Sequence, residues 1–208
     1  MKRLHLALTL GFGLAGALSA QETSPVSFNI GAGFTQPVGA TSRRLDTGWN
    51  MQGGVGYNFI PHVGAMVQFN YNSMGINSAT LNTFGVPDGS VRIWSLTLNP
   101  ILHLNPEGKV DPYIIGGGGL YHRTQEFTAP SVGVTTAFDP FFGFYDVAVP
   151  VDQVLASRSV MKPGVNIGAG IAFGSKWKGK FYAEARYHRI MFRNSHTDYI
   201  PVNFGYRW

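Results

Sequence analysis

Three residues of different chemistry alternate along the segment FYAEARYHR, which covers residues 181–189. Glu184, Arg186 and His188 are each separated by one residue, so a β-strand would place their side chains on one face. A carboxylate, a guanidinium and an imidazole on one face could form a general acid–base site, the constriction of a pore, or a network of salt bridges. Buried charges need partners, and Arg207 near the end of the chain is a further candidate. We therefore expect an internal charge network composed of Glu184, Arg186, His188 and Arg207.

A second group, Ser195, His196 and Asp198, contains the residue types of a nucleophilic triad. A triad requires side chains that converge in space, which neighbours in one short connection rarely achieve, so we expect a polar turn and no catalytic residue. The histidines lack the spacing of zinc ligands, and the aspartates of the chain lack the pattern of a calcium loop. The chain contains no cysteine, which excludes thiolate chemistry. We expect no metal site and no cofactor.

A period of two dominates the sequence and supplies the elements that position these residues. In the ending IPVNFGYRW, every second residue from Ile200 to Trp208 is large and apolar. Eight segments share this character, although a glycine run leaves the phase of the fifth undetermined. They cover residues 28–35, 49–59, 63–72, 92–102, 113–121, 164–173, 181–191 and 200–208.

The polar face of these segments indicates where they lie. Only 13% of all residues are Asp, Glu, Lys or Arg, and the alternating polar positions carry mostly Asn, Gln, Ser, Thr and Gly. The solvated face of a soluble sheet usually carries Lys and Glu, so we expect this face inside a narrow lumen and the apolar face against lipid. Aromatic residues near segment ends, such as Trp49 and Trp94, suit the interfacial girdles of such proteins. We predict an all-β fold, an eight-stranded antiparallel up-and-down transmembrane β-barrel; the alternative is a soluble sandwich or a lipocalin-like barrel.

Connections of unequal length predict an external end at which candidate interaction residues gather. The longest connection covers residues 122–160 and contains an aromatic cluster, which is either an interaction surface or a segment that packs on itself or caps the barrel mouth. Two arginines on the apolar phase near this rim, Arg92 and Arg189, could contact lipopolysaccharide phosphates or simply snorkel. The aromatic cluster consists of Phe138, Phe141, Phe142, Phe144 and Tyr145.

The first twenty residues have the three parts of a secretory signal peptide. Basic residues precede an apolar run and a group of small residues, so we expect cleavage after Ser19 or Ala20. We assign residues 1–20 to the signal peptide and residues 21–208 to one barrel domain. The net charge of +5 comes from scattered basic residues, which disfavours nucleic acid as a partner.

The sequence resembles the bacterial outer-membrane β-barrel family that includes the OmpA-type and OmpX-type eight-stranded barrels. The resemblance covers about residues 22–208 and is carried by the signal peptide, the glycine-rich motifs GGVGYNF and GAGIAFG, the FYAEARYHR strand and the aromatic ending. It implies location in the cell outer membrane, contact with outer-membrane lipid and lipopolysaccharide, and insertion by the barrel-assembly machinery. The residues that resemble the signal read by that machinery are Val202, Phe204, Tyr206 and Trp208.

A fold does not determine an activity, so function is expected only in outline. We expect a non-enzymatic barrel with a structural or surface-interaction, adhesion-like role, a side-chain-filled lumen, and a surface ligand bound through the long loop. The alternative is a narrow channel for small solutes. The third hypothesis is a lipid-modifying enzyme; the resemblance implies a lipid-facing His-x-Ser pair for such barrels, and this chain has none.

Overall fold

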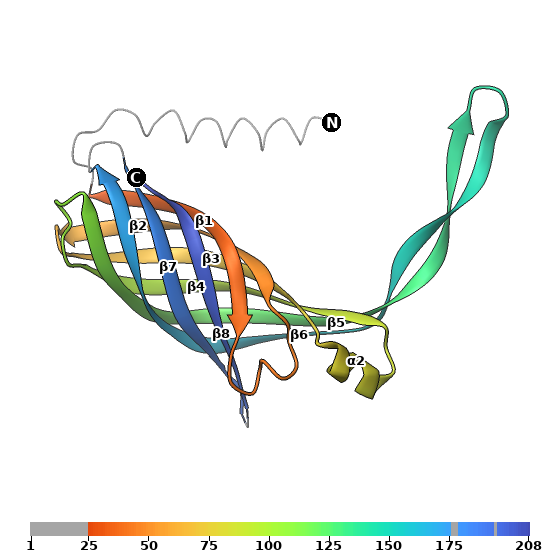
Figure 1. Cartoon of the computed structure of the whole chain (residues 1–208), viewed down its shortest axis with the longest axis horizontal. Coiled ribbons are helices and arrows are strands. Elements are labelled where there is room, and N and C mark those ends of the chain that lie inside the picture. The colour runs from red at the N-terminus through yellow and green to blue at the C-terminus, as the bar shows by residue number, and fades with distance from the viewer. Residues whose placement is uncertain (1–24, 176–178, 194) are drawn as a thin grey trace.

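The computed structural model describes residues 25–175, 179–193 and 195–208. Across these residues, eight antiparallel strands form one closed barrel in sequence order (Figure 1), and the predicted fold class is confirmed. A short helix, α2 (Ser78–Phe84), follows the third strand. No helix in the described part of the chain is long and apolar enough to cross a membrane. The strands are β1 (Val26–Pro37), β2 (Gly48–Ile60), β3 (Val63–Gly75), β4 (Asp88–His103), β5 (Val110–Asp139), β6 (Gly143–Ser175), β7 (Gly179–Met191) and β8 (His196–Arg207).

The first and last strands close the ring. β1 pairs with both β2 and β8, and Ala32 faces Phe204 across the β1–β8 seam. The final residue takes part, because Trp208 N donates to Phe28 O at 3.0 Å and Phe28 N donates to Trp208 O at 2.7 Å. An unpaired sheet edge cannot be satisfied in lipid, so this closure is what permits the strands to cross a bilayer.

The alternation of the sequence becomes an outer and an inner face. On β4, Leu96 points outward and is 51% exposed, whereas the neighbouring Thr97 points inward and is 1% exposed. Outward apolar side chains recur on all strands of the barrel and form its lipid-facing surface. Aromatic side chains lie toward both ends of this surface, with Trp49 at one end and Trp208 at the other. This arrangement matches the aromatic girdles of transmembrane barrels.

Residues 122–160 do not form a loop, and that prediction is wrong. β5 has 30 residues and β6 has 33, and the two strands remain paired beyond the barrel as a two-stranded ribbon that projects from its end (Figure 1). We call residues 128–154 the external hairpin. Its Val and Thr residues favour extended pairing. Pro130 and Pro150 favour a loop when read from sequence, but each strand of an isolated ribbon has a free edge, where proline is tolerated.

The two ends of the barrel differ. Tight turns and the carboxyl terminus lie at one end, and α2 and the external hairpin lie at the other (Figure 1). α2 is capped by Asn77, whose side chain accepts a hydrogen bond from Ala79 N at 2.8 Å, and ends at Gly85 in the left-handed conformation (φ 65°). Transmembrane barrels have short turns on the periplasmic side and longer connections outside, so the hairpin marks the external end.

Candidate functional site

The lumen contains a buried ion pair. Glu184 and Arg186, both on β7, are 2% and 1% exposed. Arg186 Nε and Nη2 lie 2.7 Å and 2.6 Å from Glu184 Oε1. Tyr113 on β5 donates its hydroxyl to Glu184 Oε2 at 2.9 Å, and Gln52 on β2 donates its amide to Oε1 at 3.3 Å. Glu184 therefore accepts hydrogen bonds from three strands, and these donors compensate its charge in the interior.

Arg207 on β8 lies near this ion pair but interacts differently. Its side chain is buried, and its Cζ lies 4.6 Å from the ring centroid of Tyr113 and 5.4 Å from that of Tyr182. The face of an aromatic ring attracts a cation at these distances. None of the guanidinium nitrogens has a hydrogen-bond partner among the described residues. The carboxylate of Glu184 attracts Arg207 through space rather than through a hydrogen bond.

His188 lies in a different layer of the lumen, nearer the external end. Its Nδ1 lies 3.0 Å from the Tyr121 hydroxyl, and its ring stacks on Tyr199 with centroids 5.1 Å apart. The structure therefore places His188 in an apolar and aromatic layer and not in hydrogen-bonding contact with Glu184. Among the aliphatic members of this external layer, Val91, Ile93 and Ile190 are fully buried.

Amide side chains fill another part of the lumen. Asn99 Nδ2 donates to Gln68 Oε1 and to Thr97 Oγ1, both at 2.8 Å, and Asn166 Nδ2 donates to Asn99 Oδ1 at 2.9 Å. All four side chains are buried. An eight-stranded barrel encloses little more than the space for such side chains, so these residues, the ion pair and the external layer occupy the interior.

Two tyrosines complete the lumen site. The hydroxyl of Tyr182 accepts a hydrogen bond from Gln52 Nε2 at 2.9 Å, and the hydroxyl of Tyr113 donates to Glu184. The alternation within β7 places Tyr182 on the same face as Glu184, so its inward direction follows from sequence. The position of Tyr113 does not, because the glycines at 116–119 leave the phase of its strand undetermined.

The two arginines at the external rim each have a carboxylate partner. Arg92 Nη2 lies 2.8 Å from Glu126 Oε2, and Arg189 binds Asp198 through Nε and Nη2 at 2.9 Å and 3.1 Å. Arg189 also donates to the Tyr187 hydroxyl at 2.7 Å. Asp198 lies beyond the aromatic girdle, outside the membrane-spanning segment. Burial raises the pKa of its carboxyl group. The hydrogen bonds from Arg189 and Tyr187 outweigh this effect and lower the pKa below its ordinary value. The arginine side chains are 47% and 45% exposed, so both remain accessible to anionic headgroups.

The aromatic cluster lies at the tip of the external hairpin, away from the barrel mouth (Figure 1). Phe138 and Phe144 pack against each other with ring centroids 5.1 Å apart. Asp139 shapes the turn, because its carboxylate accepts the backbone N–H groups of Phe141 and Phe142 at 2.8 Å and 3.1 Å. The side chains of Phe141 and Phe142 are nevertheless 91% and 87% exposed. Packing within the hairpin thus covers part of the cluster and leaves the two phenylalanines of the turn in water.

The external connection between β7 and β8 has the geometry of a salt-bridged turn. His196 Nε2 lies 3.2 Å from Asp198 Oδ2, and Asp198 N donates to Thr41 Oγ1 at 3.0 Å. The Ser195 carbonyl accepts a backbone hydrogen bond from Phe192 at 2.9 Å. These contacts hold the turn against the first external loop. Within the described ranges, no group of three or more His, Cys, Asp or Glu side chains is arranged to hold a metal ion.

Comparisons with known proteins agree with this architecture. Neisserial surface protein A superposes with a TM-score of 0.57 at 15% identity, over 90% of this chain and 98% of that one. Ail, the attachment invasion locus protein of Yersinia pestis, gives a TM-score of 0.49 at 20% identity, over 89% and 100% of the two chains. OprG from Pseudomonas aeruginosa gives 0.44 at 13% identity, over 88% and 95%. At these identities the likeness concerns the fold alone.

Sequence comparison identifies the family. No curated protein matches the chain. The family model described as "Outer membrane protein beta-barrel domain" matches residues 6–207, which is nearly the whole chain. The expected signal peptide at 1–20 lies outside the described residues. The chain belongs to the outer-membrane β-barrel family, and its place is the outer membrane.

Proposed function

We propose that this protein is a non-enzymatic outer-membrane barrel with a surface-interaction role, in which the barrel anchors the external hairpin and the hairpin tip contacts a partner. The observation that carries this proposal is the exposure of Phe141 and Phe142, at 91% and 87%, on an arm that projects from the barrel. Burying one such side chain is favourable by about 1.5–3 kcal/mol. Two of them at a projecting turn therefore offer a substantial contact to any partner with an apolar pocket.

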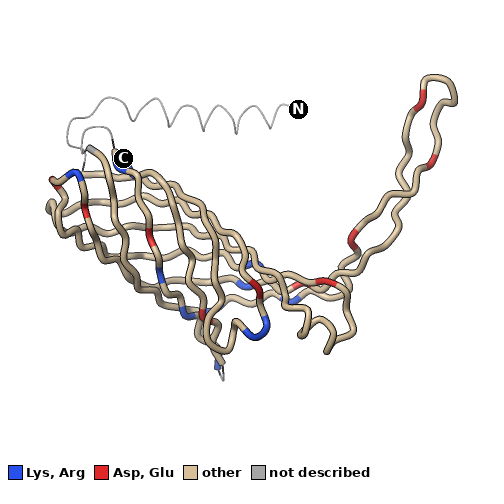
Figure 2. The backbone as a smooth tube through the Cα atoms, in the orientation of Figure 1, with Lys and Arg blue, Asp and Glu red and all other residues tan. Residues whose placement is uncertain are grey.

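The charge of the external hairpin indicates the kind of partner. Its charged residues are Asp139, Asp146 and Asp152, and no Lys or Arg occurs between positions 124 and 157 (Figure 2). An acidic arm repels polyanions, so a sulfated polysaccharide or a nucleic acid is disfavoured at the tip. We propose as partner a protein surface that offers an apolar pocket with a neutral or basic rim.

The filled lumen favours this role over that of a channel. The ion pair of Glu184 and Arg186, the amide layer around Asn99 and the external layer around His188 follow one another inside the barrel. A solute would have to displace hydrogen-bonded side chains in each layer. The side chains instead support the barrel as a stable anchor.

Adherence measurements test this proposal. Non-adherent bacteria displaying the wild-type protein should adhere to cultured epithelial monolayers, and protease treatment of the monolayer should abolish adherence because the proposed partner is a protein. Replacing residues 128–154 by a two-residue turn should remove adherence and leave the barrel folded, since loops and hairpins carry function while the barrel carries stability. A folded barrel is heat-modifiable, which means that unheated and boiled samples migrate differently on a denaturing gel. The double variant Phe141→Ser/Phe142→Ser should lose most of the adherence.

A matched control exists within the hairpin. Val132 and Val134 on its shaft are 72% and 71% exposed, so Val132→Ser/Val134→Ser removes exposed apolar side chains away from the tip. This control should adhere like the wild type. Adherence of wild-type cells no greater than that of cells lacking the protein, or full adherence after deletion of the hairpin, would contradict the proposal.

A further inference from the structure

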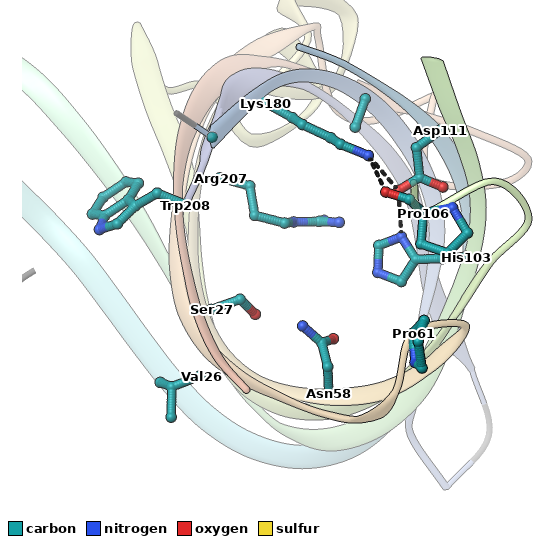
Figure 3. A pocket seen from close by; sticks show the side chains of 12 residues that line it. Val26, Ser27, Asn58, Pro61, His103, Pro106, Asp111, Lys180, Arg207 and Trp208 are labelled. Atoms are coloured by element: carbon teal, nitrogen blue, oxygen red, sulfur yellow. Dashed lines mark hydrogen bonds and ion pairs between the residues drawn. The ribbon is translucent and has the colours of Figure 1, made fainter. Parts of the chain in front are cut away.

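A cavity of about 200 Å³ opens at the periplasmic mouth of the barrel. Its wall is built from the turns after β2 and β4, from the start of β7 and from both terminal strands. The polar lining side chains point into the ring of strands, whereas Val26 and Trp208 point out of it (Figure 3). The lining includes two positively charged side chains, Arg207 and Lys180. We propose that this cavity is a binding site for a small oxyanion, a periplasmic solute that carries a carboxylate or a phosphate group. The proposal is independent of the role of the external hairpin.

Arg207 is the central element of the proposed site. It reaches toward the middle of the ring of strands (Figure 3), and the residue is only 8% exposed. The rings of Tyr113 and Tyr182 hold it in place from the lumen side. All its guanidinium nitrogens are without a hydrogen-bond partner among the described residues, which is costly for a buried charged group. The planar guanidinium matches the paired oxygens of a carboxylate or a phosphate, so an oxyanion would satisfy these donors together.

The lumen carboxylate of Glu184 forms no hydrogen bond with Arg207, because its oxygens already have other partners. Two guanidinium nitrogens of Arg186 lie 2.7 Å and 2.6 Å from Glu184 Oε1. The carboxylate also accepts hydrogen bonds from the hydroxyl of Tyr113 and the amide of Gln52. Arg207 therefore borders the cavity with its hydrogen-bonding capacity unused, and Glu184 attracts it through space from the lumen side.

The neighbouring strand β7, on which Lys180 pairs with Arg207 of β8, supplies a second cation. Lys180 Nζ donates to Pro106 O at 2.8 Å and lies 3.4 Å from Asp111 Oδ2, which also lies 2.7 Å from His103 Nδ1. Asp111 is shared between Lys180 and His103, so no carboxylate side chain of the lining forms a hydrogen bond with Arg207. An anion would bind the guanidinium of Arg207 beside the ammonium of Lys180.

The position and size of the cavity narrow the class of ligand. Lipid headgroups surround the outside of a barrel, whereas Arg207 and Lys180 point into the ring of strands (Figure 3), which favours a soluble molecule as the occupant. The volume is below the roughly 300–1,000 Å³ of sites for drug-sized ligands, which indicates a small molecule. The hydroxyl of Ser27 and the amide of Asn58 face the same space (Figure 3) and can hydrogen-bond its neutral polar groups.

Titration of the refolded full chain tests this site. The protein is prepared in micelles of an uncharged detergent, which excludes lipid phosphate, and is titrated at low ionic strength with inorganic phosphate and, separately, with succinate. Calorimetry should show saturable binding of both probes. Arg207→Gln should bind about 10- to 100-fold more weakly, because a charge-assisted hydrogen-bonding group is lost. Lys180→Met should bind more weakly than wild type but better than Arg207→Gln.

Lys109→Met provides the matched control, because Lys109 is an exposed cation at the same end of the barrel and outside the cavity. Its affinities should equal those of the wild type. Absence of saturable binding to the wild type would overturn the proposal, and so would equal affinities in all variants or an equal loss in Lys109→Met and Arg207→Gln. Folding of each variant is checked by its heat-modifiable migration. If Arg207→Gln does not refold, the comparison of Lys180→Met with Lys109→Met decides, with equal affinities refuting the site.

Discussion

Replacing Glu184 by alanine should destabilise the barrel and make the lumen leakier. The substitution removes the carboxylate that pairs with Arg186, which is 1% exposed, and it also removes the acceptor used by Tyr113 and Gln52. Loss of one partner of a fully buried ion pair costs about 3–5 kcal/mol, because the other charge is left uncompensated. Water can enter the space left by the side chain and hydrate Arg186, so we expect about 1–3 kcal/mol, the usual cost of a buried polar group without a partner.

Two measurements address the two parts of this prediction. Equilibrium unfolding in urea, with the barrel inserted in lipid vesicles, should give a lower free energy of unfolding for Glu184→Ala than for the wild type. Planar bilayer recordings should show little conductance for the wild type and more for the variant. Glu184→Gln should have a free energy of unfolding and a conductance between those of the wild type and Glu184→Ala, because glutamine keeps the volume and an acceptor oxygen but loses the charge.

The adjacent residue provides the control. Ala185 faces outward on the same strand, so Ala185→Val adds apolar surface on the lipid side and leaves the lumen untouched. It should change neither the stability nor the conductance appreciably. The reasoning is refuted if Glu184→Ala unfolds like the wild type, or if the wild type shows a large steady conductance that Glu184→Ala does not alter.

Two further predictions concern the ends of the barrel. Phe204→Ser/Tyr206→Ser should lower the heat-modifiable fraction in the outer membrane several-fold, because these residues resemble the barrel-assembly signal. Phe69→Ser, which changes another lipid-facing phenylalanine, should insert normally. Equal insertion of the two variants would contradict a signal in the last strand. At the external rim, Arg189→Gln should weaken lipopolysaccharide binding to protein in neutral micelles by up to about tenfold, and Asp198→Asn should strengthen it by releasing Arg189. Unchanged binding in both variants would exclude a contact at Arg189.

The strands that cross the membrane were predictable because two different environments act on alternate residues. Lipid selects apolar side chains on one face, and the narrow lumen selects polar or small ones on the other, so Leu96 and Thr97 differ in a way that sequence reveals. The inward direction of Glu184, Arg186 and His188 follows from the same alternation. Where glycine interrupts the pattern, as before Tyr121, neither face is marked and the direction of Tyr113 becomes visible only in the structure.

Which inward residues meet each other was not predictable in the same way. Alternation gives the face of a side chain, whereas its neighbours depend on the stagger between strands and on the tilt of the barrel. His188 shares its face with Glu184, yet it stacks on Tyr199 because β7 and β8 pair with His188 opposite Tyr199. Arg207 is opposite Lys180 in the same pairing, which places both at the mouth of the barrel and not within the ion pair.

The external hairpin was missed for a related reason. Beyond the membrane no lipid face imposes alternation, so the sequence does not mark which residues of the two strands pair in the ribbon. A two-stranded ribbon in water also leaves both of its edges free to pair with another chain. Pro130 and Pro150 remove backbone donors from those edges, and the aspartates of the hairpin add like charges that oppose pairing between copies. The features that make this segment resemble a loop in sequence are therefore those that allow an exposed hairpin to remain unpaired and to present Phe141 and Phe142 at its tip.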